Sequence, residues 1–251
     1  MSARGDDVAG HLADVVVRLD GIGLVDMLHQ QIADAWRTNM DRYEPSRLGD
    51  TLRAFGFLSA ENIQQRVLME CQGAASRWYE RDVRVSTPDN SMLIAARGVE
   101  LHVMKAPAGQ SRTPDWAASF TWNTESATRQ RCARRNSELY RSSFGTVTDG
   151  SLFALPEAPR VDRDATRCRD VFLVWSGDVP TGLTAGWLGL PCEGERPWLA
   201  VQRLWWDEPD GSVSESETEL VVADSPGTFD ALQAPSAPVR LKPRRAEEGS
   251  R

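Results

Sequence analysis

Three polar residues with the chemistry of a metal-dependent hydrolase lie close together in the sequence: Asp89, Glu100 and His102. Asp89 belongs to a Pro-Asp-Asn turn, and Glu100 and His102 lie in an extended segment that follows it. Carboxylates on neighbouring strands can bind Mg²⁺ and help to place a scissile phosphate. We therefore take all three as candidate catalytic residues, with Asp89 and Glu100 as candidate metal ligands.

This pattern resembles the PD-(D/E)xK class of nucleases, in which an Asp and a Glu on adjacent strands hold Mg²⁺. The predicted order of helix, three strands, helix and strand is similar as well. The match departs from the class at His102, where the class has Lys, and Lys105 falls on the other face of an extended strand. A turn followed by an amphipathic strand would contain the same residues. The resemblance thus implies a degenerate nuclease as the alternative function, with Mg²⁺ as its only cofactor.

A basic run predicts a second kind of site. Arg131, Arg134 and Arg135 stand at i, i+3 and i+4 of a predicted helix over residues 124–140, so they project from one face. Such a face suits contacts to phosphates, and these are the candidate nucleic-acid-binding residues. A solvated helix face whose arginines pair with acids elsewhere is the alternative interpretation.

Tryptophan is abundant, with nine residues in 251, and five of them fall between residues 171 and 206. Trp205 and Trp206 are adjacent, so on a strand they must point to opposite faces. We take them as candidate partner-binding residues, because exposed aromatic side chains often anchor protein interfaces. With no Ser or Cys nucleophile motif in the chain, we expect a non-enzymatic binding or regulatory protein that acts through a protein partner and needs no cofactor.

The elements that must position these residues follow from periodicity and turn formers. Apolar spacing of three and four predicts helices at residues 24–43 and 59–71, with a turn and a short helix over 46–58 between them. Short β-rich segments bounded by Gly, Pro and Asn predict strands at residues 82–87, 91–96, 99–105, 116–122, 171–175, 184–190 and 198–206. The sequence predicts an α+β fold: a helical part (1–73), then a strand-rich part (78–206) with two antiparallel strand groups separated by the Arg-rich helix.

The composition changes at residue 207. Residues 207–251 contain ten acidic and five basic residues, so they carry most of the formal net charge of −7. Few apolar residues are available there to stabilise a fold, which predicts a disordered acidic tail after a single domain of residues 1–206. These acids would be free to fold back on the Arg-bearing face.

The cysteines, the apolar runs and the lysine content indicate the cellular environment of the protein. The four cysteines are scattered, with no CxxC pair and no His nearby in sequence, which argues against a zinc site or a disulfide framework and favours buried thiols. The N-terminus lacks the apolar stretch of a signal peptide, so we expect a cytoplasmic protein. The longest apolar runs are five residues, against about 18 for a membrane span. Only two of 29 basic residues are lysine, which indicates a GC-rich, bacterial genome.

Overall fold

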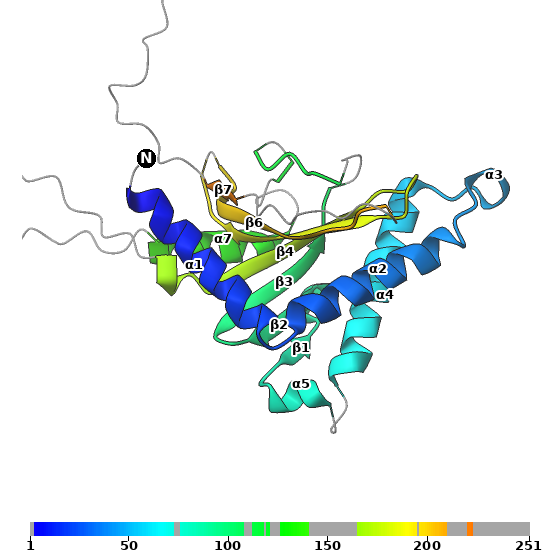
Figure 1. Ribbon diagram of the computed structural model, residues 1–251. Coiled ribbons are helices and arrows are strands. Elements are labelled where there is room, and N and C mark those ends of the chain that lie inside the picture. Colours follow the sequence, from blue (N-terminus) through cyan, green and yellow to red (C-terminus); the bar gives the residue numbers. More distant parts are fainter. Residues whose placement is uncertain are drawn as a thin grey trace, which may run out of the picture.

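The computed structural model of the chain describes residues 3–72, 76–107, 112–117, 119–120, 126–140, 165–194, 196–209 and 220–222, with the side chains of those between Val8 and Pro209 (Figure 1). Its strands form one seven-stranded sheet in the order β1-β2-β3-β4-β5-β6-β7. The strands are β1 (Arg84–Ser86), β2 (Met92–Ala96), β3 (Val99–Lys105), β4 (Asp170–Gly177), β5 (Thr184–Pro191), β6 (Trp198–Trp206) and β7 (Leu220–Val222).

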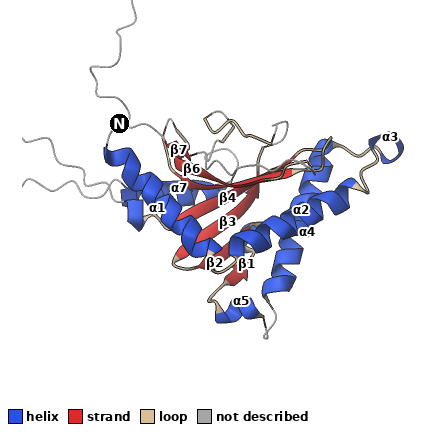
Figure 2. Cartoon of the chain, viewed as in Figure 1, coloured by secondary structure: helices blue, strands red, loops and turns tan. Residues whose placement is uncertain are grey.

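The two antiparallel strand groups share this sheet. Strands β3 and β4 are parallel, and every other neighbouring pair is antiparallel. A parallel pair needs a long crossover connection, and here helix α7 (Ala127–Tyr140) lies in that crossover. The predicted α+β class and the Arg-rich helix between two strand groups are therefore confirmed (Figure 2).

Helices precede the sheet in the chain. They are α1 (Ala3–Asp20), α2 (Leu24–Met40), α3 (Pro45–Leu48), α4 (Leu52–Cys71) and α5 (Arg77–Glu80), and the short 3₁₀ turns are η1 (Pro88–Asn90) and η2 (Ala165–Arg167). None of the described helices is both long and apolar enough to cross a bilayer.

Helix α4 begins earlier than predicted. Thr51, and not Ser59, caps it: the Thr51 hydroxyl accepts from the Ala54 N–H at 3.1 Å. Ser59 is buried within the helix and donates to the Phe55 carbonyl. The periodicity of the first two turns is weak because Leu52 and Phe57 point outward, 59% and 74% exposed. The amphipathic pattern therefore identified only the second half of the helix.

Each face of the sheet has its own apolar core. Helices α1, α2 and α4 cover one face, where Leu101 and Trp175 lie among the buried side chains. On the other face, Met104, Phe172 and Trp187 pack with Cys132 and Ala133 of α7. Successive residues of β3 and β4 alternate between the two cores, as the pleat requires. Among the polar residues, Glu100, His102 and Asp170 therefore lie on the α7 face and Lys105 lies on the other face.

One predicted strand differs in the structure. Residues 116–117 form a turn where a strand was predicted, and the rings of Trp116 and Phe120 stack 5.4 Å apart. Stacking at i, i+4 needs a turn, because side chains four apart on a strand are separated by two pleats. Within the predicted tail, the strand Leu220–Val222 pairs with β6. Of that tail only residues 207–209 and 220–222 are described, and the others lie outside the described residues.

Candidate functional site

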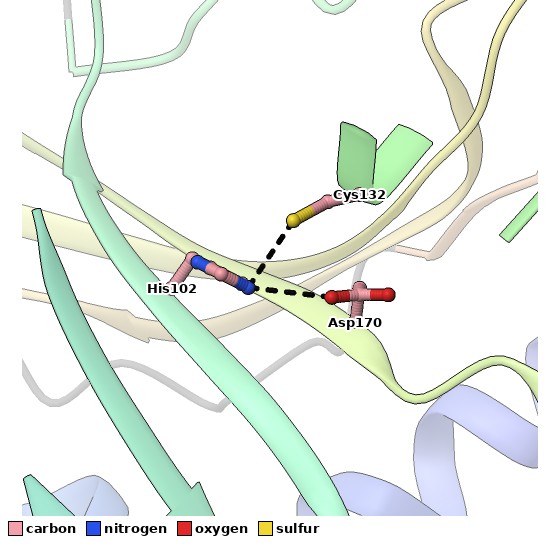
Figure 3. Close-up of side chains that lie close together, drawn as sticks. All are labelled: His102, Cys132 and Asp170. Carbon is pink, nitrogen blue, oxygen red and sulfur yellow. Dashed lines mark hydrogen bonds and ion pairs between the residues drawn. The ribbon is translucent and has the colours of Figure 1, made fainter. Parts of the chain in front are cut away.

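A buried polar cluster lies between α7 and the sheet (Figure 3). Its members are His102 from β3, Cys132 from α7 and Asp170 from β4, with exposed fractions of 8%, 2% and 1%. The His102 Nε2, the Cys132 Sγ and a carboxylate oxygen of Asp170 all lie within 4.8 Å of one another. In the part of the chain that the structure describes, this is the one group of three such ligand atoms that converges in this way.

The parallel pairing of β3 and β4 brings the cluster together. In this register Glu100 lies opposite Asp170, and His102 lies opposite Phe172. Glu100, His102 and Asp170 therefore emerge on the same face of the sheet, toward α7. The helix packs there through its small buried residues, Cys132 and Ala133, which let it approach the strands closely.

A single ring nitrogen faces both other members of the cluster. The Nε2 of His102 is 3.3 Å from the Cys132 Sγ and 3.4 Å from the Asp170 Oδ1. A neutral imidazole nitrogen has either one N–H or one lone pair, so it cannot make a full hydrogen bond to both neighbours. Either the contact to the Cys132 sulfur or the contact to the Asp170 oxygen therefore has no hydrogen bond from or to this nitrogen.

Arg135 clamps the carboxylate from the helix side. Its Nε donates to the Asp170 Oδ2 at 2.7 Å, its Nη2 donates to Oδ1, and the same Nη2 reaches the Glu100 Oε2 at 3.1 Å. Burial alone would raise the pKa of Asp170, but hydrogen bonds from His102 and Arg135 outweigh it and hold this pKa below its usual value. The hydrogen bond to Asp170 raises the pKa of Arg135.

The pKa of the Cys132 thiol is raised, whereas that of Asp170 is lowered. Burial first, and then the negative charge of Asp170, raise its pKa to about 12. Without a bound cation the side chain is therefore a protonated thiol at neutral pH. Reactive cysteines have depressed pKa values in electropositive, accessible surroundings, so Cys132 lacks the features of a nucleophile.

The predicted nuclease residues do not meet at one point. Asp89 lies in η1, where its carboxylate accepts from the Thr128 hydroxyl at 3.1 Å and lies 3.6 Å from Arg131. Because Ala95 pairs with Glu100 in the β2–β3 hairpin, Asp89 and Glu100 lie toward opposite ends of that hairpin. Glu100 and His102 reach the buried cluster or its rim, whereas Asp89 lies outside it.

The three predicted nucleic-acid-binding arginines each have an acidic neighbour. Arg131 lies near Asp89, Arg134 is 3.3 Å from Glu193, and Arg135 contacts Asp170 and Glu100. The arginine face of α7 is thus laid against carboxylates of the sheet and its loops. A polyanion would have to compete with them for the same guanidinium groups.

The predicted partner-binding tryptophans point to opposite faces, as adjacency requires. Trp205 is 8% exposed and packs over Gly186, where an added Cβ would lie 2.2 Å from the indole ring. Trp206 is only half-buried, and the Arg112 guanidinium lies 4.0 Å over its ring. Of the two, only Trp206 has substantial accessible area for a partner.

A second, partly buried carboxylate lies on the face covered by α1, α2 and α4. The Asp207 Oδ1 is 2.6 Å from the His29 Nε2, and its Oδ2 accepts from the Thr184 amide at 2.9 Å and the Thr184 hydroxyl at 2.7 Å. Burial would raise the pKa of Asp207, but these hydrogen bonds outweigh it and lower the pKa to about 2. The His29 ring stacks on Trp205, whose Nε1 donates to the Thr184 hydroxyl.

Sequence reasoning missed Cys132 and Asp170. They lie 30 and 68 residues from His102, beyond any short motif. Two features of the sequence point weakly to these residues: Cys132 shares a helix face with Arg135, and Asp170 directly precedes an apolar strand. Neither indicates that the two residues meet a histidine.

Comparisons with protein-family models, with curated proteins and with solved structures found no match to this chain. A functional assignment therefore depends on the geometry of the cluster and of the surfaces around it.

Proposed function

We propose that this protein is a metal-binding protein in which Cys132, His102 and Asp170 hold a divalent transition-metal ion, with zinc as the best fit. The observation that carries the proposal is the shared nitrogen: the His102 Nε2 faces the Cys132 Sγ and the Asp170 Oδ1 at once. A cation between the three atoms satisfies all of them through their lone pairs. Thiolate, imidazole and carboxylate are the three side-chain ligand types of zinc proteins.

The spacing of the ligand atoms suits tetrahedral zinc. With bond lengths of about 2.3 Å to sulfur, 2.05 Å to nitrogen and 2.0 Å to oxygen, tetrahedral angles put sulfur about 3.6 Å and oxygen about 3.3 Å from the nitrogen. The corresponding separations in the cluster are 3.3 Å and 3.4 Å. Tetrahedral angles put sulfur and oxygen about 3.5 Å apart, and in the cluster they lie within 4.8 Å of each other, so the side chains would adjust to admit the ion.

The surrounding charge suits a divalent cation. Asp170, Glu100 and a metal-bound Cys132 thiolate would bring three negative charges, and Arg135 brings one positive charge. Two negative charges therefore remain for a divalent cation to balance. Binding at the Asp170 Oδ1 displaces the Nη2 of Arg135 from that oxygen. The Nε of Arg135 keeps its 2.7 Å bond to Oδ2 and becomes an outer-sphere partner that orients the carboxylate.

The same geometry argues against a cysteine nucleophile. In a Cys-His-Asp triad the acid orients one ring nitrogen while the other takes the thiol proton. Here both partners face the same nitrogen, and the thiol pKa is raised to about 12. A bound metal instead deprotonates a coordinating thiol outright.

A metal at this position would join three elements. Its ligands come from β3, α7 and β4, so the free energy of metal binding would stabilise the docking of the helix onto the sheet. A non-enzymatic, regulatory role follows, in which metal supply controls how firmly α7 is seated. A nuclease site at Asp89 and Glu100 has less geometric support, because these carboxylates lie toward opposite ends of one hairpin.

Titration of the metal-free protein with Co²⁺ tests the proposal. We expect one tightly bound ion per chain, with the thiolate-to-cobalt absorption and intense visible bands of a tetrahedral site, and displacement of cobalt by Zn²⁺. Cys132→Ser should abolish the thiolate band, and both Cys132→Ser and His102→Gln should weaken binding severely. Cys71→Ser, at a buried cysteine outside the cluster, is the matched control and should bind normally.

Thermal unfolding supplies a second measurement. Zn²⁺ should raise the Tm of the wild type and of Cys71→Ser, because a ligand that binds only the folded state stabilises it. Cys132→Ser should not respond. Equal cobalt spectra in wild type and Cys132→Ser, or no metal-dependent change in Tm, would overturn the proposal.

A further inference from the structure

A cavity of about 350 Å³ opens between α4 and the sheet. It lies at the end of β3 that is remote from Glu100, beside η1 and the start of β2. Three cationic side chains line it, Arg53, Lys105 and Arg129, against a single acidic one, Glu61. The apolar part of the lining comes from Leu52, Phe57, Met92, Val103 and Trp175. The volume falls at the small end of the range of roughly 300–1,000 Å³ typical of ligand pockets.

Lys105 is the unusual residue of this cavity. Its side chain runs beneath α4, where a Cβ added to Gly56 would lie 3.2 Å from the Lys105 Cε. The ammonium lies 5.8 Å from the ring centres of both Trp36 and Trp175. In the part of the chain that the structure describes, it makes no hydrogen bond and no ion pair.

The two indole rings account for the position of the Lys105 stem but leave its charge poorly satisfied. Cation–π attraction acts to about 6 Å, so both contacts lie at its outer limit. The ammonium has three N–H donors, and a ring face accepts none of them as a carboxylate or phosphate would. Burial lowers the pKa of Lys105, as expected for an ammonium removed from water without an acidic neighbour.

We infer that this cavity binds a small organic anion whose acidic headgroup pairs with Lys105 and whose apolar body lies against α4. The excess of cationic side chains selects a negatively charged headgroup, and Arg53 and Arg129 at the lining add to the positive potential. Phe57 and Leu52, which remain 74% and 59% exposed, offer the surface that an alkyl or aryl group would cover. A carboxylate and a phosphate share the required headgroup chemistry.

The cavity is independent of the proposed metal site. Lys105 and His102 leave β3 on opposite faces, and the Lys105 side chain meets Trp36 and Trp175 of the core beneath the N-terminal helices. Removal of Cys132 should therefore leave anion binding unchanged. Failure of one proposal would not imply failure of the other.

The test uses octanoate, octyl phosphate and neutral 1-octanol with the full-length protein. Isothermal titration and the fluorescence of the tryptophans should report saturable binding of at least one anion, with octanol at least tenfold weaker. The relative affinities of octanoate and octyl phosphate identify the preferred headgroup. A charge-assisted hydrogen bond contributes about 1.5–3 kcal/mol, which corresponds to roughly 10- to 100-fold in Kd.

Lys105→Met removes the charge while keeping the length of the stem, so it should fold and should weaken anion binding by that 10- to 100-fold. Arg37→Gln, at an exposed α2 residue outside the cavity lining, is the matched control and should bind as the wild type does. Equal affinity of the wild type for octanoate and octanol would overturn the inference without any variant. Binding by Lys105→Met within threefold of the wild type would overturn it as well.

Discussion

Two carboxylates on opposite faces of the sheet, the buried Asp170 and the partly buried Asp207, each contact the Nε2 of a histidine, but only at Asp170 does a third side chain share that nitrogen. At Asp207 both oxygens have partners at 2.6–2.9 Å, and His29 is held by stacking on Trp205. At Asp170 the histidine is 3.4 Å away and shares the same nitrogen with the Cys132 thiol.

The difference separates a structural hydrogen-bond network from a candidate ligand-binding one. The Asp207 network closes on itself, with a donor for each oxygen, and fixes the end of β6 against β5 and α2. At Asp170 both oxygens accept from Arg135, but the His102 Nε2 faces the Cys132 Sγ as well as Oδ1, so one ring nitrogen has two neighbours. Because a neutral ring nitrogen cannot make a full hydrogen bond to both neighbours, the Asp170 network is the one for which we propose a ligand.

The largest effect is expected from removing the aromatic support of the closed network. Trp205→Ala should lower the free energy of unfolding by about 3–5 kcal/mol, because it empties a buried site beneath α2 and frees His29. Urea denaturation measures the loss. Trp206→Ala, the adjacent and half-buried residue, should cost less than half as much. Equal losses would contradict the assignment of Trp205 alone to the core.

Removal of the Asp170 carboxylate should have the next largest effect. Asp170→Ala leaves His102 and the half-exposed Arg135 without their shared partner, and loss of hydrogen bonds to a charged group costs about 1.5–3 kcal/mol. Chemical denaturation of metal-free protein measures this loss. Glu193→Ala breaks the exposed pair with Arg134 on the same helix and should change stability by about 0–1 kcal/mol.

The closed network should also show in the pH dependence of stability. Because the pKa of Asp207 falls from 3.8 to about 2 on folding, its contribution is full above pH 3.8 and disappears as the pH falls toward 2. The shift corresponds to about 2 kcal/mol at neutral pH. Asp207→Asn should therefore be destabilised at pH 7 and approach the wild type at pH 2. Asp34→Asn, at an exposed α2 carboxylate, should show no such pH-dependent difference.

The smallest effect is expected at the surface of α7. Arg131→Gln should change the free energy of unfolding by less than about 1 kcal/mol, because Arg131 and Asp89 are 70% and 72% exposed. If these arginines instead bind nucleic acid, the affinity for duplex DNA should fall steeply between low and high salt. Arg131→Gln would then reduce that salt dependence, which a binding titration at two salt concentrations measures.

Much of the local structure could be predicted from the sequence. The bounds of β3 and β6 agree with prediction, and the opposite orientations of Trp205 and Trp206 follow from adjacency on a strand. The Arg-bearing helix was predicted from composition and spacing, although its predicted first residues lie outside the described ones. Strong periodicity within ten residues was enough for each of these features.

Helix α4 and the segment at 116–120 show where such reasoning fails. The start of α4 keeps apolar side chains exposed, so no amphipathic pattern marks it. Trp116 and Phe120 look like strand residues, but they stack on each other and pack on Trp187 and Trp198 of the sheet. At residues 116–120 tertiary contacts outweigh the local preference, whereas at the start of α4 the exposed side chains leave no pattern to detect.

The sequence by itself determined the α+β class, the alternation along β3 that sends His102 and Lys105 to opposite faces, and the presence of Glu100 and His102 among the polar residues near the candidate site. Only the tertiary structure decided that His102 meets Cys132 and Asp170, and that Lys105 lies in a cavity where it forms no ion pair with any described residue. The reason is physical: alternation is a property of a few neighbouring residues, whereas the cluster depends on the parallel pairing of β3 with β4 and on the docking of α7 across that pair.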